Sequence, residues 1–176
     1  IGGESTRPGS PAVPLEEEMR RVLPFVQAAV QFGVPISVDT YKAQVMQAVL
    51  DAGADIINDV WALRQPGAQS VVANHPHCGV VLMHMHKTPQ DMQQTPMQGD
   101  AVAQVQNFLA QQTQALVALG VERQRIVWDY GIGFGKTVAQ NFALLAQQAA
   151  LTRQGFALLA GWSRKSSLGQ VTNLSV

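Results

Sequence analysis

The chain has 176 residues, of which 47% are hydrophobic and only 14% are charged, and its formal net charge is zero. This composition predicts one folded domain over residues 1–176 with a substantial core, and it excludes a disordered tail. The neutral charge argues against a nucleic-acid binder, and the lack of an apolar run of about 18 residues argues against a membrane protein. The single cysteine, Cys78, cannot form an internal disulfide, which fits a reducing cytoplasm.

Helix-like and strand-like segments alternate along the chain. The helical segments are amphipathic, the first one opens on three acidic residues that complement the helix dipole, and glycines follow the others. The strand-like segments are short and end on polar or small residues. In chain order, the expected elements are a helix over 15–32, a strand over 35–39, a helix over 42–51, strands over 55–60 and 79–84, a helix over 101–119, a strand over 125–129, a helix over 138–153 and a strand over 156–161.

These strands are apolar on both faces, which is typical of parallel strands packed between two layers. The alternation fits both a doubly wound sheet and a closed barrel. Polar residues stand at the carboxyl ends of many successive strands, which favours the barrel, because all strand ends surround one mouth there. The sequence therefore predicts an α/β fold that is part of a (β/α)₈ TIM barrel. The longest irregular segment is expected over 87–100.

The first candidate site follows a predicted strand end at Glu4-Ser-Thr-Arg-Pro-Gly9. Thr6 offers a hydroxyl group, and the planar cation of Arg7 suits bidentate binding of a carboxylate or phosphate. Pro8 and Gly9 indicate a turn that directs both side chains at a ligand. An ordinary polar loop explains the same residues equally well.

The second candidate is a pair of side chains at two strand ends, Asp39 and Asn58. A carboxylate beside a carboxamide can form paired hydrogen bonds with the N–H and C=O edges of a heterocycle. As alternatives, Asp39 would cap the helix that follows it, and the neighbouring Asp59 would be a turn residue. The repeated pattern at two strand ends favours a functional pair.

The third candidate is Asp129 with the glycine-rich segment 130–137. Its glycines permit positive φ angles or a close approach of the backbone to a ligand. Tyr130 stands where a phosphate-binding P-loop needs its first glycine, so the spacing does not match that motif. A pocket wall that includes Gly133 and Phe134 is the better interpretation.

The fourth candidate is Gly161-Trp-Ser-Arg-Lys-Ser-Ser167, after the last predicted strand. Lys165 among small hydroxyl residues at a helix start is suited to an anion or oxo group, although a basic surface loop is the alternative. His84 and His86 are spaced as two metal ligands could be, but no third ligand is near them in sequence. Their methionine neighbours, including Met83, indicate the rim of a pocket instead.

Taken together and in this order, these segments resemble the dihydropteroate synthase family over essentially the whole chain. The matching blocks are Glu4-Ser-Thr-Arg-Pro-Gly9, Ser37-Val-Asp-Thr40, Ile57-Asn-Asp59, Leu82-Met-His-Met85, Gly131 to Lys136 and Ser163-Arg-Lys-Ser166. The resemblance implies a transferase of folate biosynthesis and a target of sulfonamides. It would join p-aminobenzoate to 6-hydroxymethyl-7,8-dihydropterin pyrophosphate and release pyrophosphate. It also implies a TIM-barrel homodimer that uses Mg²⁺.

The resemblance assigns roles by motif match. Asp39, Asp129 and Lys165 would be the catalytic residues and would hold the pterin together with Asn58. The pterin pocket would be lined by Met83, Gly133, Phe134 and Gly161. The p-aminobenzoate and the leaving group would be bordered by Thr6, Arg7, Pro8 and Ser163. A buried carboxylate, Asp39 or Asp129, would stabilise the positive charge left by departing pyrophosphate, so an Asp39→Asn change is expected to lower kcat more than pterin binding.

Two departures from the family pattern qualify these expectations. Tyr130 stands where family members usually have proline, which leaves Asp129 in place. The family's first and last strands, which usually hold Mg²⁺ and pyrophosphate, have no counterpart between Ile1 and Val176. We therefore expect a fragment with about strands two to seven, no metal ligand, open sheet edges, poor stability and no activity on its own.

Three alternatives remain at this stage. A methyltetrahydrofolate-binding methyltransferase domain would share the Asp39 and Asn58 contacts but should lack the loops at 4–9 and 161–167. An inactive truncated remnant would fold poorly. A phosphosugar-binding barrel would not explain Asp39, Asn58 and Asp129 together.

Overall fold

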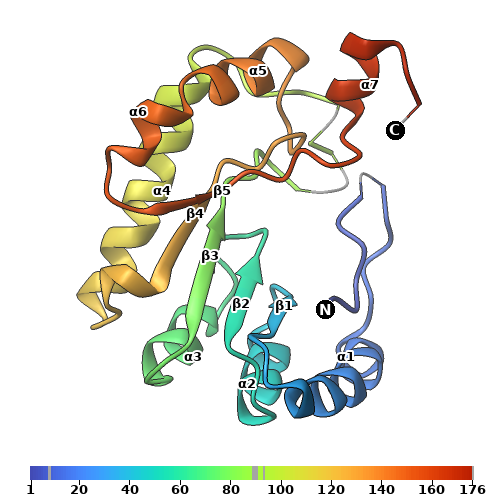
Figure 1. Ribbon diagram of the computed structural model, residues 1–176, viewed down its shortest axis with the longest axis vertical. Helices are drawn as coiled ribbons and strands as arrows, with labels where there is room; N and C mark the ends of the chain where they lie inside the picture. Colours follow the sequence, from blue (N-terminus) through green and yellow to red (C-terminus); the bar gives the residue numbers. More distant parts are fainter. Residues whose placement is uncertain (8, 89–90, 93, 176) are drawn as a thin grey trace.

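In the computed structural model, residues 1–7, 9–88, 91–92 and 94–175 are described. Within them, parallel strands form one five-stranded sheet in the order β1-β2-β3-β4-β5 (Figure 1). Their bounds are β1 Ser37–Asp39, β2 Ile56–Asp59, β3 Gly79–Met83, β4 Ile126–Asp129 and β5 Ala157–Leu159. Each predicted strand is present, somewhat shorter than expected.

The strand order distinguishes between the two architectures that the sequence allowed. Every strand pairs with the next strand in the chain, as in an arc of a barrel, whereas a doubly wound sheet reverses its order at a switch point. The N-terminal segment extends the arc beyond β1, because the amide of Asp39 donates to the carbonyl of Ile1 at 2.7 Å and Gly2 forms a bridge to Asp39. The strand expected before Glu4 is therefore reduced to a single bridge.

Helices run in an arc around the outside of the sheet (Figure 1). Those predicted over 15–32, 42–51 and 101–119 correspond to α1 Leu15–Ala29 with the 3₁₀ turn η1 Val30–Phe32, to α2 Ala43–Asp51 and to α4 Ala101–Ala118. The segment 87–100 contains no helix or strand in its described part, as predicted. None of the helices that the structure describes is long and apolar enough to cross a membrane.

The single helix predicted over 138–153 is wrong. The segment forms two helices, α5 Val138–Ala146 and α6 Gln148–Thr152, because Gln147 has a ψ angle of 11° and interrupts the helical backbone. The short helix α3 Ala68–Asn74 and the 3₁₀ turn η2 Arg123–Arg125 were not predicted, whereas α7 Ser166–Thr172 begins directly after Lys165, where a helix start was expected.

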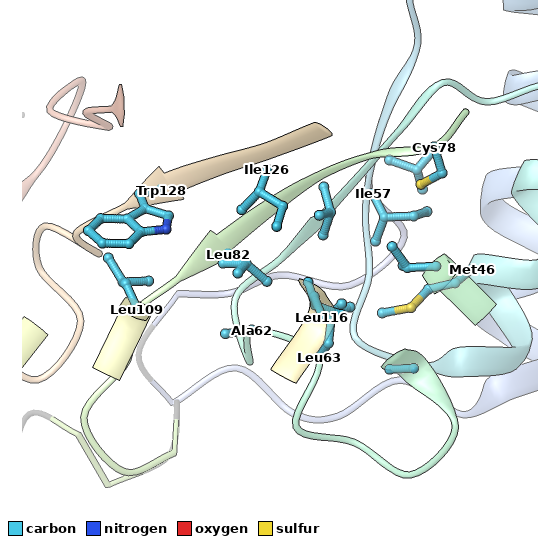
Figure 2. Close-up of a cluster of buried hydrophobic side chains, with 14 of the residues drawn as sticks. Met46, Ile57, Ala62, Leu63, Cys78, Leu82, Leu109, Leu116, Ile126 and Trp128 are labelled. Carbon is cyan, nitrogen blue, oxygen red and sulfur yellow. The ribbon is translucent and has the colours of Figure 1, made fainter. Parts of the chain in front are cut away.

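The main core lies between the strands and the helices that cover them. In Figure 2, Leu109 of α4 lies close to Trp128 of β4, whose indole N–H donates to Thr113 of α4 at 2.9 Å. Cys78, directly before β3, is fully buried, as expected of a small apolar residue. Further side chains labelled in this cluster are Met46, Ile57, Ala62, Leu63, Leu82, Leu116 and Ile126. This packing fixes the strands and thereby the positions of their carboxyl ends.

Candidate active site at the carboxyl ends of the strands

Asp39 and Asn58 form the first part of the site. They are register partners on β1 and β2, and the Asn58 amide donates to Asp39 Oδ1 at 2.8 Å. Asp39 does not cap α2, because Lys42 is the N-cap residue. The expectation that Asp39 is buried is wrong: its side chain is exposed at the sheet edge. The amide oxygen of Asn58 is buried and accepts no hydrogen bond from the residues described, which a buried polar atom rarely tolerates without a partner.

A small pocket opens beside this pair. Its cavity volume of about 20 Å³ is enough for roughly one water molecule, so a heterocycle would lie across its mouth and not inside it. Thr6 reaches the pocket from the N-terminal loop. The lining residues are Glu4, Thr6, Glu18, Asp39, Thr40, Tyr41, Asn58 and Val60.

A charged network anchors the loop that carries Thr6. Lys42 binds Glu4 at 2.6 Å and also binds Glu18, which accepts a hydrogen bond from Thr40 at 2.7 Å. Burial would lower the pKa of Lys42, but its hydrogen bonds to Glu18 and Glu4 raise it above the ordinary value. The network therefore ties the start of the loop to α1 and α2. Arg7 is exposed at the rim, and Pro8 lies outside the described residues.

Asp129 lies at the end of β4 and is buried, with 7% of its surface exposed. Burial raises the pKa of this carboxyl group to about 6, although the N–H of Gly131, at 2.7 Å, and the cations Lys165 and Lys136 act in the opposite direction. The register places Met83 of β3 beside it. Its burial at a strand end, beside two lysines, makes Asp129 a candidate functional residue.

Lys136, the last residue of the glycine-rich block, is buried beneath the same region. Its ammonium group donates to the carbonyl oxygens of His84, Gly131 and Phe134 at 3.2, 2.9 and 3.3 Å. Burial lowers its pKa to about 7, although Asp129 acts to raise it. Gly131 has a φ of +65°, and a Cβ atom there would lie 1.9 Å from the His84 carbonyl oxygen, so only glycine permits this close packing.

Lys165 reaches back over the glycine-rich loop from the start of α7. Its Nζ lies 4.4 Å from the centroid of the Phe134 ring, and a methyl group on Gly133 would lie 3.3 Å from its Cδ. Burial lowers the pKa of Lys165, and Asp129 acts in the opposite direction. A cation held against an aromatic ring and near a buried carboxylate can bind a polar ring substituent.

An apolar cluster, separate from the main core, lines this part of the site. It contains the predicted Met83 and Phe134 and also Met85 and Met92, with Val60 and Trp61 packed against it. Val60 also lines the pocket beside Asp39 and Asn58. The predicted residues therefore fall into two groups. The Asp39 group consists of Asp39, Asn58 and Thr6, and the Asp129 group consists of Asp129, Met83, Phe134 and Lys165. Val60 belongs both to the pocket of the first group and to the apolar cluster of the second.

Two predicted residues remain at the periphery. Ser163 is exposed, and its side chain forms no hydrogen bond with another of the described site residues. Gly161 is half-buried, and nothing lies within 4 Å of where its Cβ would be, so there is open space beside it. Their contact with a ligand stays a prediction.

The two histidines considered as metal ligands differ in environment. His84 is buried against Phe108, with ring centroids 5.0 Å apart, and burial lowers its pKa to about 2, with further lowering by nearby cations. His86 is half-buried. In the part of the chain that the structure describes, no three His, Cys, Asp or Glu side chains are grouped as a metal site would need.

Sequence reasoning missed residues that support the site from below. The sequence patterns assign Lys136 no role beyond the end of a glycine-rich block, and they do not single out Asn141 within the helix predicted over 138–153. A charged side chain after three closely spaced glycines is a signal for Lys136. An asparagine within an apolar helix face is the signal for Asn141, since a buried amide needs hydrogen-bond partners.

The whole chain, residues 1–176, matches the family model described as "Pterin binding enzyme". The dihydropteroate synthase of Escherichia coli K12 is 42% identical over 175 residues, which cover 99% of this chain and 62% of that protein. That of Synechocystis is 43% identical over 173 residues, or 97% of this chain and 60% of the relative. The chain thus spans about 62% of the length of the curated relatives it matches.

Solved structures of the same kind superpose closely on this chain. Dihydropteroate synthase of Xanthomonas albilineans with 4-aminobenzoic acid has a TM-score of 0.92 and 48% identity, and covers 100% of this chain and 62% of its own. The Burkholderia cenocepacia enzyme with 7,8-dihydropteroate has a TM-score of 0.88 and 51% identity, with coverages of 98% and 64%. The Yersinia pestis enzyme with a sulfonamide drug has a TM-score of 0.95 and 42% identity, with coverages of 99% and 64%. The five-stranded sheet is therefore part of a TIM barrel.

Proposed function

Since the chain belongs to the family of pterin-binding enzymes, we propose that it forms the substrate pocket of a dihydropteroate synthase. This enzyme joins p-aminobenzoate to 6-hydroxymethyl-7,8-dihydropterin pyrophosphate and releases pyrophosphate. The observation that carries the proposal is the arrangement of Asp39, Asn58 and Asp129 at the carboxyl ends of three parallel strands. A carboxylate–amide pair and a second, buried carboxylate match the alternating donors and acceptors of a pterin.

In this proposal, the pterin lies between the Asp39 group and the Asp129 group. Asp39 and Asp129 accept hydrogen bonds from pterin N–H groups, and the free amide oxygen of Asn58 accepts another. Lys165 binds the pterin carbonyl oxygen, and Met83, Gly133, Phe134 and Gly161 border the ring. The apolar cluster around Phe134 supports this placement, because it offers a surface on which a planar ring can pack.

The second substrate enters from the rim in this proposal. Thr6, Arg7, Pro8 and Ser163 border p-aminobenzoate and the leaving group, and the exposed guanidinium of Arg7 is free to bind an anionic substrate group. The Xanthomonas albilineans structure, which holds 4-aminobenzoic acid and superposes over the full chain, supports a site for this substrate.

The reaction needs no protein nucleophile. The bond between the pterin methylene and pyrophosphate oxygen breaks, and the leaving group departs with the electron pair. Positive charge then spreads over the methylene and the ring, where the carboxylates of Asp39 and Asp129 stabilise it. The aniline nitrogen forms the new C–N bond and releases its proton to solvent.

The family resemblance implies Mg²⁺ beside the pyrophosphate. The described residues offer no cluster of three carboxylate, histidine or cysteine side chains, so these residues do not fit the ion. We propose that the ligands for Mg²⁺ lie outside this chain. We further propose that the whole enzyme is a homodimer and that it works in the cytoplasm, where the buried, unpaired Cys78 would stay reduced.

The proposal is tested on the complete gene product that contains this chain. Purified protein is incubated with Mg²⁺, p-aminobenzoate and the dihydropterin pyrophosphate, and formation of 7,8-dihydropteroate and pyrophosphate is measured together. Equal amounts of both products are expected, with loss of turnover when sulfonamide is added. Absence of dihydropteroate, with methyl transfer from methyltetrahydrofolate to a corrinoid, would instead establish the methyltransferase alternative.

A further inference from the structure

The side chain of Asn141 lies at the junction of two loops of the site. It is the fourth residue of α5 and only 1% exposed, so its amide faces the protein interior and not solvent. A buried amide is costly unless its donor and acceptor are both used. The position therefore requires a structural or functional reason.

Both ends of the Asn141 amide are hydrogen-bonded, and they bind different segments. Its oxygen accepts from the backbone N–H of Gly133 at 3.0 Å, within the glycine-rich loop. Its nitrogen donates to the hydroxyl group of Ser167 at 2.9 Å, in the first turn of α7, and also to the carbonyl oxygen of Lys136 at 3.5 Å. One planar group thus joins two loops that are far apart in sequence.

These two loops carry neighbouring walls of the site. Gly133 lies against the side chain of Lys165, and Lys165 precedes Ser167 by two residues. Ser167 is itself 4% exposed, so its hydroxyl group is held inside the protein. The length and planarity of the Asn141 amide therefore fix the separation between the glycine-rich loop and the segment that bears Lys165.

From this geometry we propose that Asn141 is a positioning residue for the pterin site, which holds Gly133 and Lys165 at the separation that a pterin ring requires. The proposal rests on the proposed pterin-dependent function and adds to it a residue that touches neither substrate. Because misplacement of a binding group by about 1 Å can cost on the order of 100-fold in rate, loss of this bridge should impair turnover strongly.

The test compares three single variants of the complete gene product and the double variant that combines Asn141→Leu with Ser167→Ala. Asn141→Leu removes all three hydrogen bonds of the side chain with little change in volume, and Ser167→Ala removes only the bond to α7. Thr113→Val is the matched control, because it breaks a buried side-chain hydrogen bond of 2.9 Å, to Trp128, within the main core and touches none of the groups joined by Asn141. Melting temperature, kcat, KM for each substrate, and calorimetric binding of 6-hydroxymethyl-7,8-dihydropterin are measured for each.

We expect Asn141→Leu to lower kcat by about 10- to 100-fold and to weaken pterin binding, and Ser167→Ala to act in the same direction but less strongly. Thr113→Val should lower the melting temperature by about as much as Asn141→Leu does, but it should leave kcat and both KM values unchanged. The double variant should lose no more than Asn141→Leu alone, because both changes break one bridge. Equal kinetic losses in Asn141→Leu and Thr113→Val, or additive losses in the double variant, would overturn the inference.

The proposed function is tested separately, by measuring whether the unaltered protein forms 7,8-dihydropteroate. Pterin binding by calorimetry does not require turnover, so the bridge is still tested if the protein binds a pterin and catalyses another reaction. If Asn141→Leu does not fold, the milder Ser167→Ala variant retains the comparison, since it leaves the bond to Gly133 in place.

Discussion

At the scale of single residues, the site contains two carboxylates in opposite environments. Asp39 is exposed and is oriented by Asn58, whereas Asp129 is buried among a backbone N–H group and two lysines. Burial therefore makes a negative charge costly at Asp129, whereas the exposed Asp39 carries no such cost. A neutral side chain should accordingly have different effects on stability at the two positions.

Asp39→Asn should lower kcat by about 10- to 1,000-fold while changing pterin binding less, since removing one electrostatic group from a transition state has effects of this size. The amide oxygen of the new side chain can still accept the hydrogen bond from Asn58, so geometry is retained and charge is lost. Steady-state kinetics with calorimetric binding of the pterin measure the two effects. An unchanged kcat would rule out a role for the charge.

Asp129→Asn should stabilise the fold near pH 7 while reducing activity. The pKa of Asp129 is raised from 3.8 to about 6, so the folded state favours the protonated carboxyl group. Its contribution to stability is present below about pH 4 and is lost as pH rises through about 6. The variant should therefore gain up to about 3 kcal/mol at pH 7, and the gain should shrink towards pH 4.

Urea unfolding of both proteins at several pH values checks this prediction, together with kcat/KM. A pH-independent difference in unfolding free energy would mean that the carboxyl group does not titrate in this range. We expect kcat/KM of the variant to be low at all pH values. In the unaltered protein, kcat/KM should fall only below about pH 6, where Asp129 becomes protonated.

Much of the site could be predicted from residue types at strand ends, because parallel strands bring their carboxyl ends to one edge. Asp39, Asn58, Met83 and Asp129 all follow this rule. Burial could not be predicted this way, since a strand end does not reveal what packs over it, and Asp39 was wrongly expected to be buried. The supporting roles of Lys136 and Asn141 depend on contacts between loops that the sequence does not display.

At the scale of elements, long periodic helices were predictable and short ones were not. α1 and α4 show apolar spacing over several turns. By contrast, α3 and α7 have seven residues each, which is too short for a periodic pattern to stand out, so α3 was missed and only the start of α7 was expected. The break at Gln147 has no glycine or proline to mark it, so the predicted helix over 138–153 ran through it.

The start of α5 gives a prediction at this scale. Thr137 forms a capping box with Gln140, in which each side chain binds the other residue's backbone N–H, at 3.2 and 2.9 Å. Thr137→Ala should lower the free energy of unfolding by about 1 kcal/mol, whereas Thr137→Ser should change it much less. Urea denaturation measures both. Equal losses in the two variants would show that the hydroxyl group is not the stabilising feature.

At the scale of the molecule, the barrel was predictable because polar residues occur at many strand ends and not at one switch point. The consecutive strand order confirms this interpretation. The same order leaves an arc with two ends. At the first, the N-terminal segment bonds to β1 through Asp39, while at the second β5 has no further strand beside it among the described residues.

This open arc predicts poor stability for residues 1–176 expressed alone. The outer edge of β5 presents unpaired backbone groups, and apolar side chains such as Phe25, Phe32 and Leu174 are 67%, 75% and 70% exposed. Exposed strand edges and apolar surface favour association of partly folded chains. We expect the isolated chain to aggregate or melt without a sharp transition and to show no turnover, whereas the complete gene product should unfold cooperatively. Calorimetry and light scattering on both proteins make the comparison, and a cooperative transition with activity in residues 1–176 would show that the arc is sufficient on its own.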